Sequence, residues 1–452
     1  MSSAHIDAKW LLRAVDQFDR QGRPFVEVFP ELDALQSQIT TVARARRAAR
    51  RTSDWAMANR LTIEIANLRK EVREEVVALL ELDLPNVLDL VDEPQSLWEL
   101  VPVRGLVSPA ATYRLKDTDR AHLLARFVVE TDLRGNLSPQ GVDRTALCAA
   151  LFSTLEEPSP KVVVKTDVQA FYESVSHEML VEVVKNRPDL SPTAADHVSA
   201  LLRSFTQTAG ARVGLPRGVA LSAFLGELVL AELDQSIGRD LDVVQYFRYV
   251  DDVVVVFGAG GPKSRPQDRR RQVVSAIEEL GLKANPEKSL ALELPLSKSS
   301  RVRSIEYLGY RFELRSNSVT AELSEKKIRR LSTRVTRAFD AFRSSSRTDA
   351  DGNQLVQRIE LVTSNYRLSG RKARSYVGLA FASPLVGSTS RSVRELDRNL
   401  ALEIASISSD RALIARLEPL SFSSGIDDVR FVKVSAKRIQ RLSYIWRNLG
   451  EK

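Results

Sequence analysis

The pattern of apolar and polar positions divides the chain into three stretches. In residues 1 to about 100, apolar side chains recur at helical spacing, as at Leu61 and Ile65. Between residues 101 and 315, short runs of β-branched and aromatic residues alternate with helical patterns, which is typical of an α/β fold. Helical patterns rich in Arg and Lys return afterwards. We therefore predict an α/β domain at 101–315 between a helical extension at 1–100 and a helical part at 316–452.

Proline and small polar residues mark the expected boundaries within this plan. Pro85 and Pro94 lie in an acidic stretch and predict a break after the N-terminal helices. The segment 343–354, RSSSRTDADGNQ, is rich in Ser, Asp, Gly and Asn and predicts a flexible loop.

Composition narrows the class of protein. The chain has 452 residues, of which 43% are hydrophobic and 27% charged, as in soluble globular proteins. Its sequence contains neither an apolar run long enough for a membrane span nor a signal-peptide pattern. The single cysteine, Cys148, excludes an internal disulfide and a thiolate zinc cluster, so we expect a cytoplasmic protein. The net charge of +8 suits a polyanionic partner.

The segment FRYVDDVVVVFG, residues 247–258, places two carboxylates beside an apolar run. Asp251 and Asp252 lie between stretches of β-formers, which predicts a hairpin with both side chains at its tip. A second apolar run, 162–164, leads to Asp167 and predicts a strand that ends in a carboxylate. Clustered carboxylates are costly unless cations neutralise them, and two Mg²⁺ ions are the expected solution. The alternative is a set of turn aspartates that face solvent.

Three further motifs accompany the aspartates. GLPRGVALS, 214–222, predicts a tight turn that lets the backbone approach a flat ligand, with Ser222 opening an apolar helix. Lys288 follows an Asn-Pro turn in NPEK. IEYLGYRF, 305–312, predicts a strand that is interrupted at Gly309.

In this order, TDVQAFY, GLPRGVALS, YVDD, NPEK and YLGY resemble the motifs of reverse transcriptases, over about residues 160 to 312. The resemblance implies a right-hand polymerase of α+β type, with palm, fingers and a helical thumb. It also implies two Mg²⁺ ions, or alternatively Mn²⁺, at Asp167, Val168 and Asp251, with Asp252 as the third carboxylate. The implied partners are an RNA template, dNTPs and a DNA product.

The resemblance also implies roles for residues around the carboxylates. Tyr172 falls at the position of the steric gate that excludes a ribose 2′-hydroxyl, although a simply packed aromatic is the alternative. Lys288 corresponds to a proton donor for pyrophosphate. The substrate-binding turn would contain Arg217, Gly218 and Ser222, and the primer grip would contain Leu308, Gly309 and Tyr310.

Two departures from the family pattern concern the turn at 214–222 and the residue that follows it. Arg217 stands where Gln is usual, and Ala223 stands where Pro is usual after Ser222. Template use is therefore expected to differ from that of typical members.

FRYVDD and VSHEML resemble segments of bacterial members of the family. The features of the retroviral, group II intron and retron branches are not found in the sequence, which leaves the group linked to antiphage defence, where helical extensions are common. Such a role implies a dedicated noncoding RNA as partner and is compatible with a homo-oligomer. The alternatives are a reverse transcriptase linked to a group II intron, a retron or a CRISPR locus, and an untemplated or protein-primed DNA polymerase.

Basic residues predict nucleic-acid contacts outside the motifs. A helix from Ser324 would have one apolar stripe and a neighbouring basic stripe, which suits a duplex backbone or only improves solubility. The basic stripe contains Lys327, Arg330, Arg334 and Arg337.

Other basic segments could likewise either contact nucleic acid or have only a structural or solubilising role. The arginines between 44 and 51 either contact phosphates or form a solvated face. In 365–378 and 435–448, arginines alternate with aromatics, including Tyr444 and Trp446, that either stack on bases or pack internally. The triphosphate-binding cations of the fingers are sought among Arg114, Lys116 and Arg120.

Overall fold

The computed structural model describes residues 6–21, 25–103, 111–116, 119–134, 143–260, 265–369, 374–407 and 410–446. By its internal contacts the chain divides into two compact units, each built from segments distant in sequence. The first unit contains 1–104, 110–138 and 175–228, and the second contains 105–109, 139–174 and 229–452.

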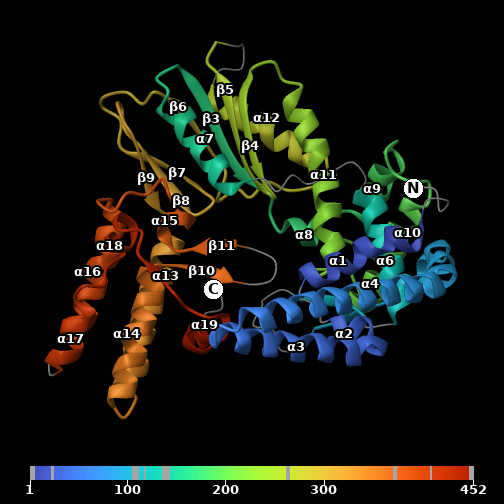
Figure 1. Cartoon of the computed structure of the whole chain (residues 1–452). Helices are drawn as coiled ribbons and strands as arrows, with labels where there is room; N and C mark the ends of the chain where they lie inside the picture. The colour runs from blue at the N-terminus through green and yellow to red at the C-terminus, as the bar shows by residue number, and fades with distance from the viewer. Residues whose placement is uncertain are drawn as a thin grey trace. The chain divides into compact units, whose positions relative to one another are not determined.

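The first unit is mainly helical. It consists of α1 (Ala8–Gln21), α2 (Phe25–Val28), η2 (Pro30–Leu32), α3 (Asp33–Arg51), α4 (Trp55–Asp92), α5 (Pro94–Leu97), β1 (Leu100–Pro102), β2 (Tyr113–Leu115), α6 (Arg120–Arg134), α9 (His177–Lys185), α10 (Ala194–Ala209) and the first part of α11 (Ala220–Gly238). Helix α3 packs along α4 (Figure 1), whose apolar positions such as Leu61 and Ile65 are buried. Strands β1 and β2 pair antiparallel.

The predicted break at Pro85 is wrong, because this proline lies inside α4. Pro85 is exposed, so water can satisfy the helix carbonyl that its missing N–H leaves unpaired. Pro94 does mark a boundary, since it begins α5 after α4 ends at Asp92.

The second unit begins with α7 (Arg144–Glu156) and is organised around a four-stranded antiparallel sheet in the order β4-β5-β3-β6. The strands are β3 (Lys161–Asp167), β4 (Val243–Tyr249), β5 (Asp252–Gly258) and β6 (Leu290–Leu294), and the short α8 (Phe171–Ser174) follows β3. Every residue of β3 is buried, which explains its continuous apolar run.

The sheet of the second unit is covered on both faces (Figure 1). Val163 and Val256 form part of the core that includes Cys148 of α7. On the other face, Arg269 of α12 (Pro266–Glu278) lies over the ring of Phe257, at 4.6 Å from its centre. Burial on both faces holds the ends of β3 and β5 in fixed register.

The rest of the second unit combines two small sheets with helices. These elements are β7 (Arg303–Tyr307), β8 (Tyr310–Leu314), β9 (Val319–Leu323), α13 (Glu325–Arg343), α14 (Asp349–Thr363), β10 (Asn365–Ser369), β11 (Arg374–Val377), α15 (Leu379–Ala382), α16 (Arg391–Ala405), α17 (Arg411–Leu417), α18 (Phe422–Asp427), β12 (Phe431–Val432), α19 (Ala436–Leu442) and η3 (Ser443–Trp446). The sheets have the orders β7-β8-β9 and β11-β10-β12.

Two expectations for this C-terminal half are corrected. The segment 343–354 is a loop only at its start, because Thr348 caps α14 together with Asp351 in a capping box. The hairpin of β10 and β11 was not foreseen within a part predicted to be helical, and residues 370–373 between these strands lie outside the described residues. No helix among the described residues is both long and apolar enough to span a membrane.

Candidate active site

The two adjacent aspartates lie at the tip of the β4–β5 hairpin, as predicted. Asp251 occupies the turn after Val250, which has a φ of 55°, and Asp252 begins β5. The four valines behind them, Val253–Val256, are fully buried in the sheet. The apolar run therefore anchors the hairpin and leaves the carboxylates at its end.

Asp167 joins this pair through the pairing of β3 with β5. In the antiparallel register Asp167 lies opposite Asp252, and the amide of Val168 donates to the carbonyl of Asp251 at 3.2 Å. Asp167 is buried, with 7% of its surface exposed. The structure thus brings together the three aspartates that the sequence singled out.

Their proximity changes the electrostatics of the site. Burial and the charge of Asp167 raise the pKa of Asp251 to about 6. Burial also raises the pKa of Asp252, although the ammonium of Lys165 opposes this shift. Like charges held together in a partly buried place favour either protonation or a bound cation.

Two lysines neutralise part of this charge. Lys288 forms an ion pair with Oδ2 of Asp167, which raises the pKa of Lys288. Lys165 lies 3.1 Å from Oδ1 of Asp252. Lys288 was predicted, whereas Lys165 was missed, although its position two residues before Asp167 in a strand places both side chains on one face.

The loop that carries Lys288 is bound to the end of β3. The amide of Asn285 donates to the carbonyl of Asp167 at 2.7 Å, and the hydroxyls of Thr166 and Ser289 are 2.6 Å apart. The predicted Asn-Pro turn therefore fixes Lys288 beside the carboxylates.

The arrangement and the donor atoms of the carboxylates determine how well they fit a divalent cation. Among the described residues, no group of three or more His, Cys, Asp or Glu side chains is arranged to hold a metal ion. Asp252 pairs with Lys165 and Asp167 pairs with Lys288, so two ammonium groups contact the cluster. Asp167 and Asp251 also offer the anionic oxygens that Mg²⁺ prefers. The donor chemistry of these two residues fits such an ion.

A further ion pair, between Arg248 and Asp234, fixes the base of the hairpin and was not foreseen. Arg248 donates from Nε and Nη2 to the two carboxylate oxygens of Asp234 in α11, each at 2.6 Å, and the hydroxyl of Tyr246 donates to the same carboxylate at 2.7 Å. Arg248 also donates to the carbonyl of Val250 at 3.2 Å. Since a bidentate pair is strongly directional, Arg248 positions the tip that carries Asp251. No local sequence signal pairs Arg248 with Asp234.

Tyr172 lies in α8, shortly after Asp167. Its ring is half-buried and meets Phe171 edge-on, with ring centres 5.6 Å apart. This placement is compatible with a contact to substrate sugar, and the gate role stays a prediction.

The predicted turn at 214–222 belongs to the first unit. Gly218 has a φ of +92°, and a Cβ atom there would lie 2.5 Å from the carbonyl oxygen of Tyr113, so only glycine fits. The amide of Tyr113 donates to the carbonyl of Arg217 at 2.7 Å, and His177 contacts the carbonyl of Gly214 at 2.9 Å. The structural role expected for His177 is thereby supported.

Ser222 requires a correction. It is 1% exposed, and its hydroxyl donates to the carbonyl of Pro216 at 2.8 Å. The helix begins at Ala220, so Ser222 lies within its first turn. Its hydroxyl stabilises the turn and is not presented to a substrate.

The predicted primer grip is the turn of the β7–β8 hairpin and not an interrupted strand. Leu308 and Gly309 have φ values of 48° and 82°, which match the turns that favour tight hairpins. Arg144 of α7 donates to the carbonyl of Leu308. Tyr310 is 2% exposed and stacks on Phe312, so the turn presents its backbone and Tyr310 supports it from below.

The basic stripe of α13 is only partly available. Ser324 caps this helix, as predicted. Lys327 is buried, because its ammonium donates to the carbonyl of Ala382 at 3.2 Å and to the hydroxyl of Ser383. Arg334 lies over the ring of Trp446 at 5.8 Å, and Arg337 donates to the carbonyl of Ile445 at 3.3 Å. Arg330 is exposed, and nucleic-acid contact stays a prediction for this helix.

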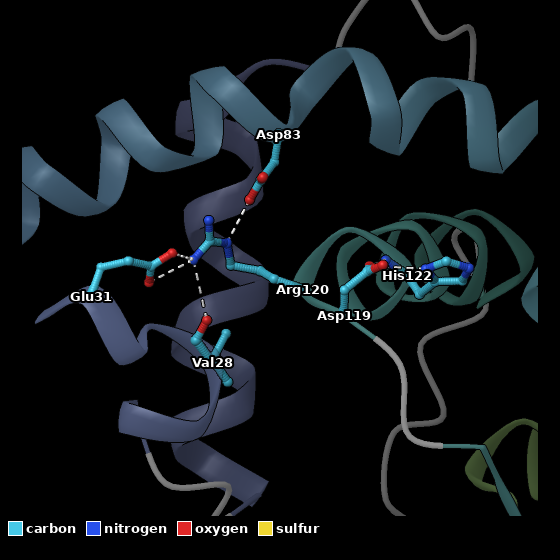
Figure 2. A network of polar contacts seen from close by, with 6 residues as sticks. All are labelled: Val28, Glu31, Asp83, Asp119, Arg120 and His122. Atoms are coloured by element: carbon cyan, nitrogen blue, oxygen red, sulfur yellow. Dashed lines mark hydrogen bonds and ion pairs between the residues drawn. The ribbon is translucent and has the colours of Figure 1, made fainter. Parts of the chain in front are cut away.

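The cations sought in the fingers have other partners. Figure 2 shows Arg120 between Asp83 of α4 and Glu31 of η2, at 2.5 and 2.9 Å, with the carbonyl of Val28 at 3.4 Å. Lys116 pairs with Glu99 at 2.8 Å. Arg120 therefore joins the N-terminal helices to α6 and is not placed as a triphosphate ligand.

Comparison with known proteins bears on what the aspartates do. Residues 128–312 match the model of the reverse transcriptase (RNA-dependent DNA polymerase) family. This segment of the chain is similar to a reverse transcriptase domain. It spans Asp167, Asp251 and Asp252 and ends at Phe312 in β8. A search of curated proteins finds no match.

Reverse transcriptases are RNA-directed DNA polymerases and therefore nucleotidyltransferases. The domain supports RNA-directed DNA polymerase activity, with an RNA template, dNTPs as substrates and DNA as product. It also implies a polymerase palm, in keeping with the mixed helix and sheet observed. Enzymes of this family generally use divalent metal ions.

Proposed function

We propose that the enzyme copies RNA into DNA at the carboxylates Asp167, Asp251 and Asp252. The observation that carries this proposal is the β3–β5 register, which places Asp167 opposite Asp252 and beside the hairpin tip. The rigid sheet behind them supplies the positional accuracy that nucleotide transfer needs.

In the proposed reaction, the 3′-oxygen of the growing strand attacks the α-phosphorus of a dNTP. The bond from that phosphorus to the bridging oxygen of the β-phosphate breaks, and pyrophosphate leaves. The 3′-hydroxyl loses its proton to solvent water, and the ammonium of Lys288 supplies a proton to pyrophosphate. Two divalent cations, Mg²⁺ or alternatively Mn²⁺, held by Asp167, Val168 and Asp251 with Asp252 beside them, would provide Lewis-acid stabilisation of the charges that develop.

Tyr172 is proposed to select deoxynucleotides. Primer extension by Tyr172→Ala with dTTP and with UTP tests this role, because loss of the ring opens space for a 2′-hydroxyl. We expect the preference for dTTP to fall by about tenfold or more. Tyr172→Phe keeps the ring and should retain the preference, and unchanged selectivity in Tyr172→Ala would contradict the role.

We further propose that the enzyme acts in bacterial antiphage defence with a dedicated noncoding RNA. The support is the similarity of FRYVDD and VSHEML to segments of bacterial members, together with helical extensions, which are common in the defence-linked group. Sequencing of the nucleic acids that purify with the protein from its native locus tests this proposal. One defined RNA with complementary DNA is expected, whereas DNA without a complement, or DNA joined to the protein, would point to untemplated or protein-primed synthesis.

A further inference from the structure

A basic groove lies between α14 and the C-terminal segment formed by α19 and η3, all in the second unit. Its volume is about 1060 Å³. Arg358 from α14 and Lys437, Arg438 and Arg441 from α19 line it. No carboxylate is found among the described residues of its lining. A set of cations without compensating charge favours an anionic ligand.

The burial of Arg358 distinguishes this groove from a surface whose cations are all solvated. Arg358 has an exposed fraction of 7%, and its Nε is buried without a hydrogen-bond partner among the described residues. Burial and the nearby charge of Arg441 lower the pKa of Arg358. A buried guanidinium without a counter-ion is costly, and a phosphate bound in the groove would supply the missing charge.

The other groups of the groove fit the remaining parts of a nucleotide. Gln354, Gln357 and Gln440 contribute amides, which can both donate to and accept from base edges. Tyr444 is 70% exposed and presents a ring on which a base can stack. Trp446, by contrast, is 8% exposed and donates to the carbonyl of Arg334 at 3.0 Å. The two aromatics of this segment therefore differ in exposure, since Tyr444 is exposed and Trp446 is buried.

We propose that this groove binds a single-stranded stretch of RNA, with phosphates near the four cations and a base against Tyr444. The assignment of RNA rests on the proposed reverse transcription, whereas the binding itself requires no nucleotide transfer. A single strand is favoured over a duplex because amides and an exposed ring serve unpaired bases, which a duplex does not offer.

The test measures the binding of a fluorescein-labelled 15-nucleotide oligouridylate to the full chain by anisotropy, at several KCl concentrations. The variant Lys437→Gln/Arg438→Gln/Arg441→Gln removes three cations of the groove. We expect its affinity at 100 mM KCl to fall about tenfold or more, and its salt dependence to become shallower by about 2 in log–log slope. The matched control Arg391→Gln/Arg394→Gln/Arg398→Gln removes equal charge from α16 and should bind almost as the wild type does.

A second variant distinguishes binding of a nucleic acid from binding of other anions. Tyr444→Ala should weaken oligouridylate binding by about fivefold or more without changing the salt slope, because it removes stacking and no charge. The proposal is overturned if the triple variant binds like the wild type, if the α16 control loses as much affinity, or if double-stranded RNA of equal length shows the same dependence on Tyr444. Primer extension by the wild type, assayed in parallel on annealed template and primer, reports on the proposed polymerase function independently of the groove.

Discussion

At the scale of single residues, the site is defined by charges that repel one another. Asp251 is held near Asp167, and this repulsion together with burial raises its pKa to about 6. The folded chain therefore carries an electrostatic cost at neutral pH that the unfolded chain does not. Such a cost is expected where residues are arranged for function and not for stability.

The substitution Asp251→Asn should have opposite effects on activity and on stability. We expect primer extension to fall by at least about 1000-fold. Without divalent ions at pH 7.5, the free energy of unfolding should rise by about 1–3 kcal/mol, because the substitution removes the repulsion. Urea unfolding in EDTA measures the second effect. Asp16→Asn, an exposed substitution on α1, is the control and should change neither property, and a clear destabilisation by Asp251→Asn would contradict the electrostatic interpretation.

Lys327 carries a second cost of the same kind, since burial lowers its pKa from 10.5 to about 8, with a further contribution from nearby Arg144. Between pH 8 and 10.5 the unfolded chain binds more protons here than the folded chain does, so this lysine makes stability rise with pH in that range. From pH 7 to 9.5 the wild type should gain about 2 kcal/mol relative to Lys327→Met.

Urea unfolding at both pH values measures this difference between the two proteins. Lys298→Met, an exposed substitution, should behave like the wild type. Equal pH dependence in the wild type and Lys327→Met would show that the buried ammonium keeps an ordinary pKa.

The residue scale also shows what could be predicted from sequence. The placement of Asp167, Asp251 and Asp252 at strand ends could be predicted, because each lies directly before or shortly after a buried apolar run. Lys327 was misplaced because helical periodicity gives the angle of a side chain, whereas its burial depends on Ser383, distant in sequence. Partners of that kind leave no mark in a local pattern.

At the scale of elements, the β4–β5 hairpin depends on its contact with α11. Asp234 of that helix accepts both donors of Arg248, and Arg248 in turn binds the carbonyl of Val250 beside Asp251. The position of the carboxylates therefore follows from a helix as well as from the sheet.

Arg248→Lys tests this dependence, because lysine keeps the charge but cannot make the bidentate contact. We expect the rate of primer extension to fall about tenfold with a loss of stability of about 1–2 kcal/mol, since small displacements of reacting groups are costly. Arg303→Lys, on the exposed side of β7, is the matched control. An unchanged rate in Arg248→Lys would mean that the valines alone position the tip.

Elements were predicted well where one face or both faces of a segment are apolar, as for β3, β5 and α13. Elements were predicted poorly where helix capping or a tight turn determines where a helix or strand begins or ends. The capping box of Thr348 and Asp351 extends α14 into a segment that composition alone marks as a loop. The positive φ values of Leu308 and Gly309 turn one expected strand into a hairpin.

At the scale of the whole molecule, the N-terminal helices are joined to α6 by the Arg120 network (Figure 2). The side chain of Arg120 is 15% exposed, and its carboxylate partners Asp83 and Glu31 are 23% and 46% exposed. Removal of the guanidinium would leave Asp83 partly buried without its cation.

Arg120→Ala should therefore lower the free energy of unfolding of the first unit by about 2–4 kcal/mol. Lys116→Ala removes an exposed pair of the same unit and should cost about 0.5 kcal/mol or less. Urea unfolding followed by tryptophan fluorescence compares the two. Equal small effects would show that the network does not hold the N-terminal helices in place.

The division into a helical N-terminal extension, a polymerase core and a helical C-terminal part remains a prediction. Residues 1–104 share one compact unit with 110–138 and 175–228, and such grouping of distant segments has no local signal in a sequence. The motifs were nevertheless found, because each depends on a few neighbouring residues.

The most direct measurement is extension of a labelled DNA primer annealed to a defined RNA template, with dNTPs and Mg²⁺. The wild type should produce full-length complementary DNA. Asp167→Asn should produce none, while it retains the circular dichroism spectrum of the wild type and a cooperative unfolding transition. Extension by Asp167→Asn at the rate of the wild type, or no RNA-dependent extension by the wild type, would contradict the assignment of these carboxylates to reverse transcription.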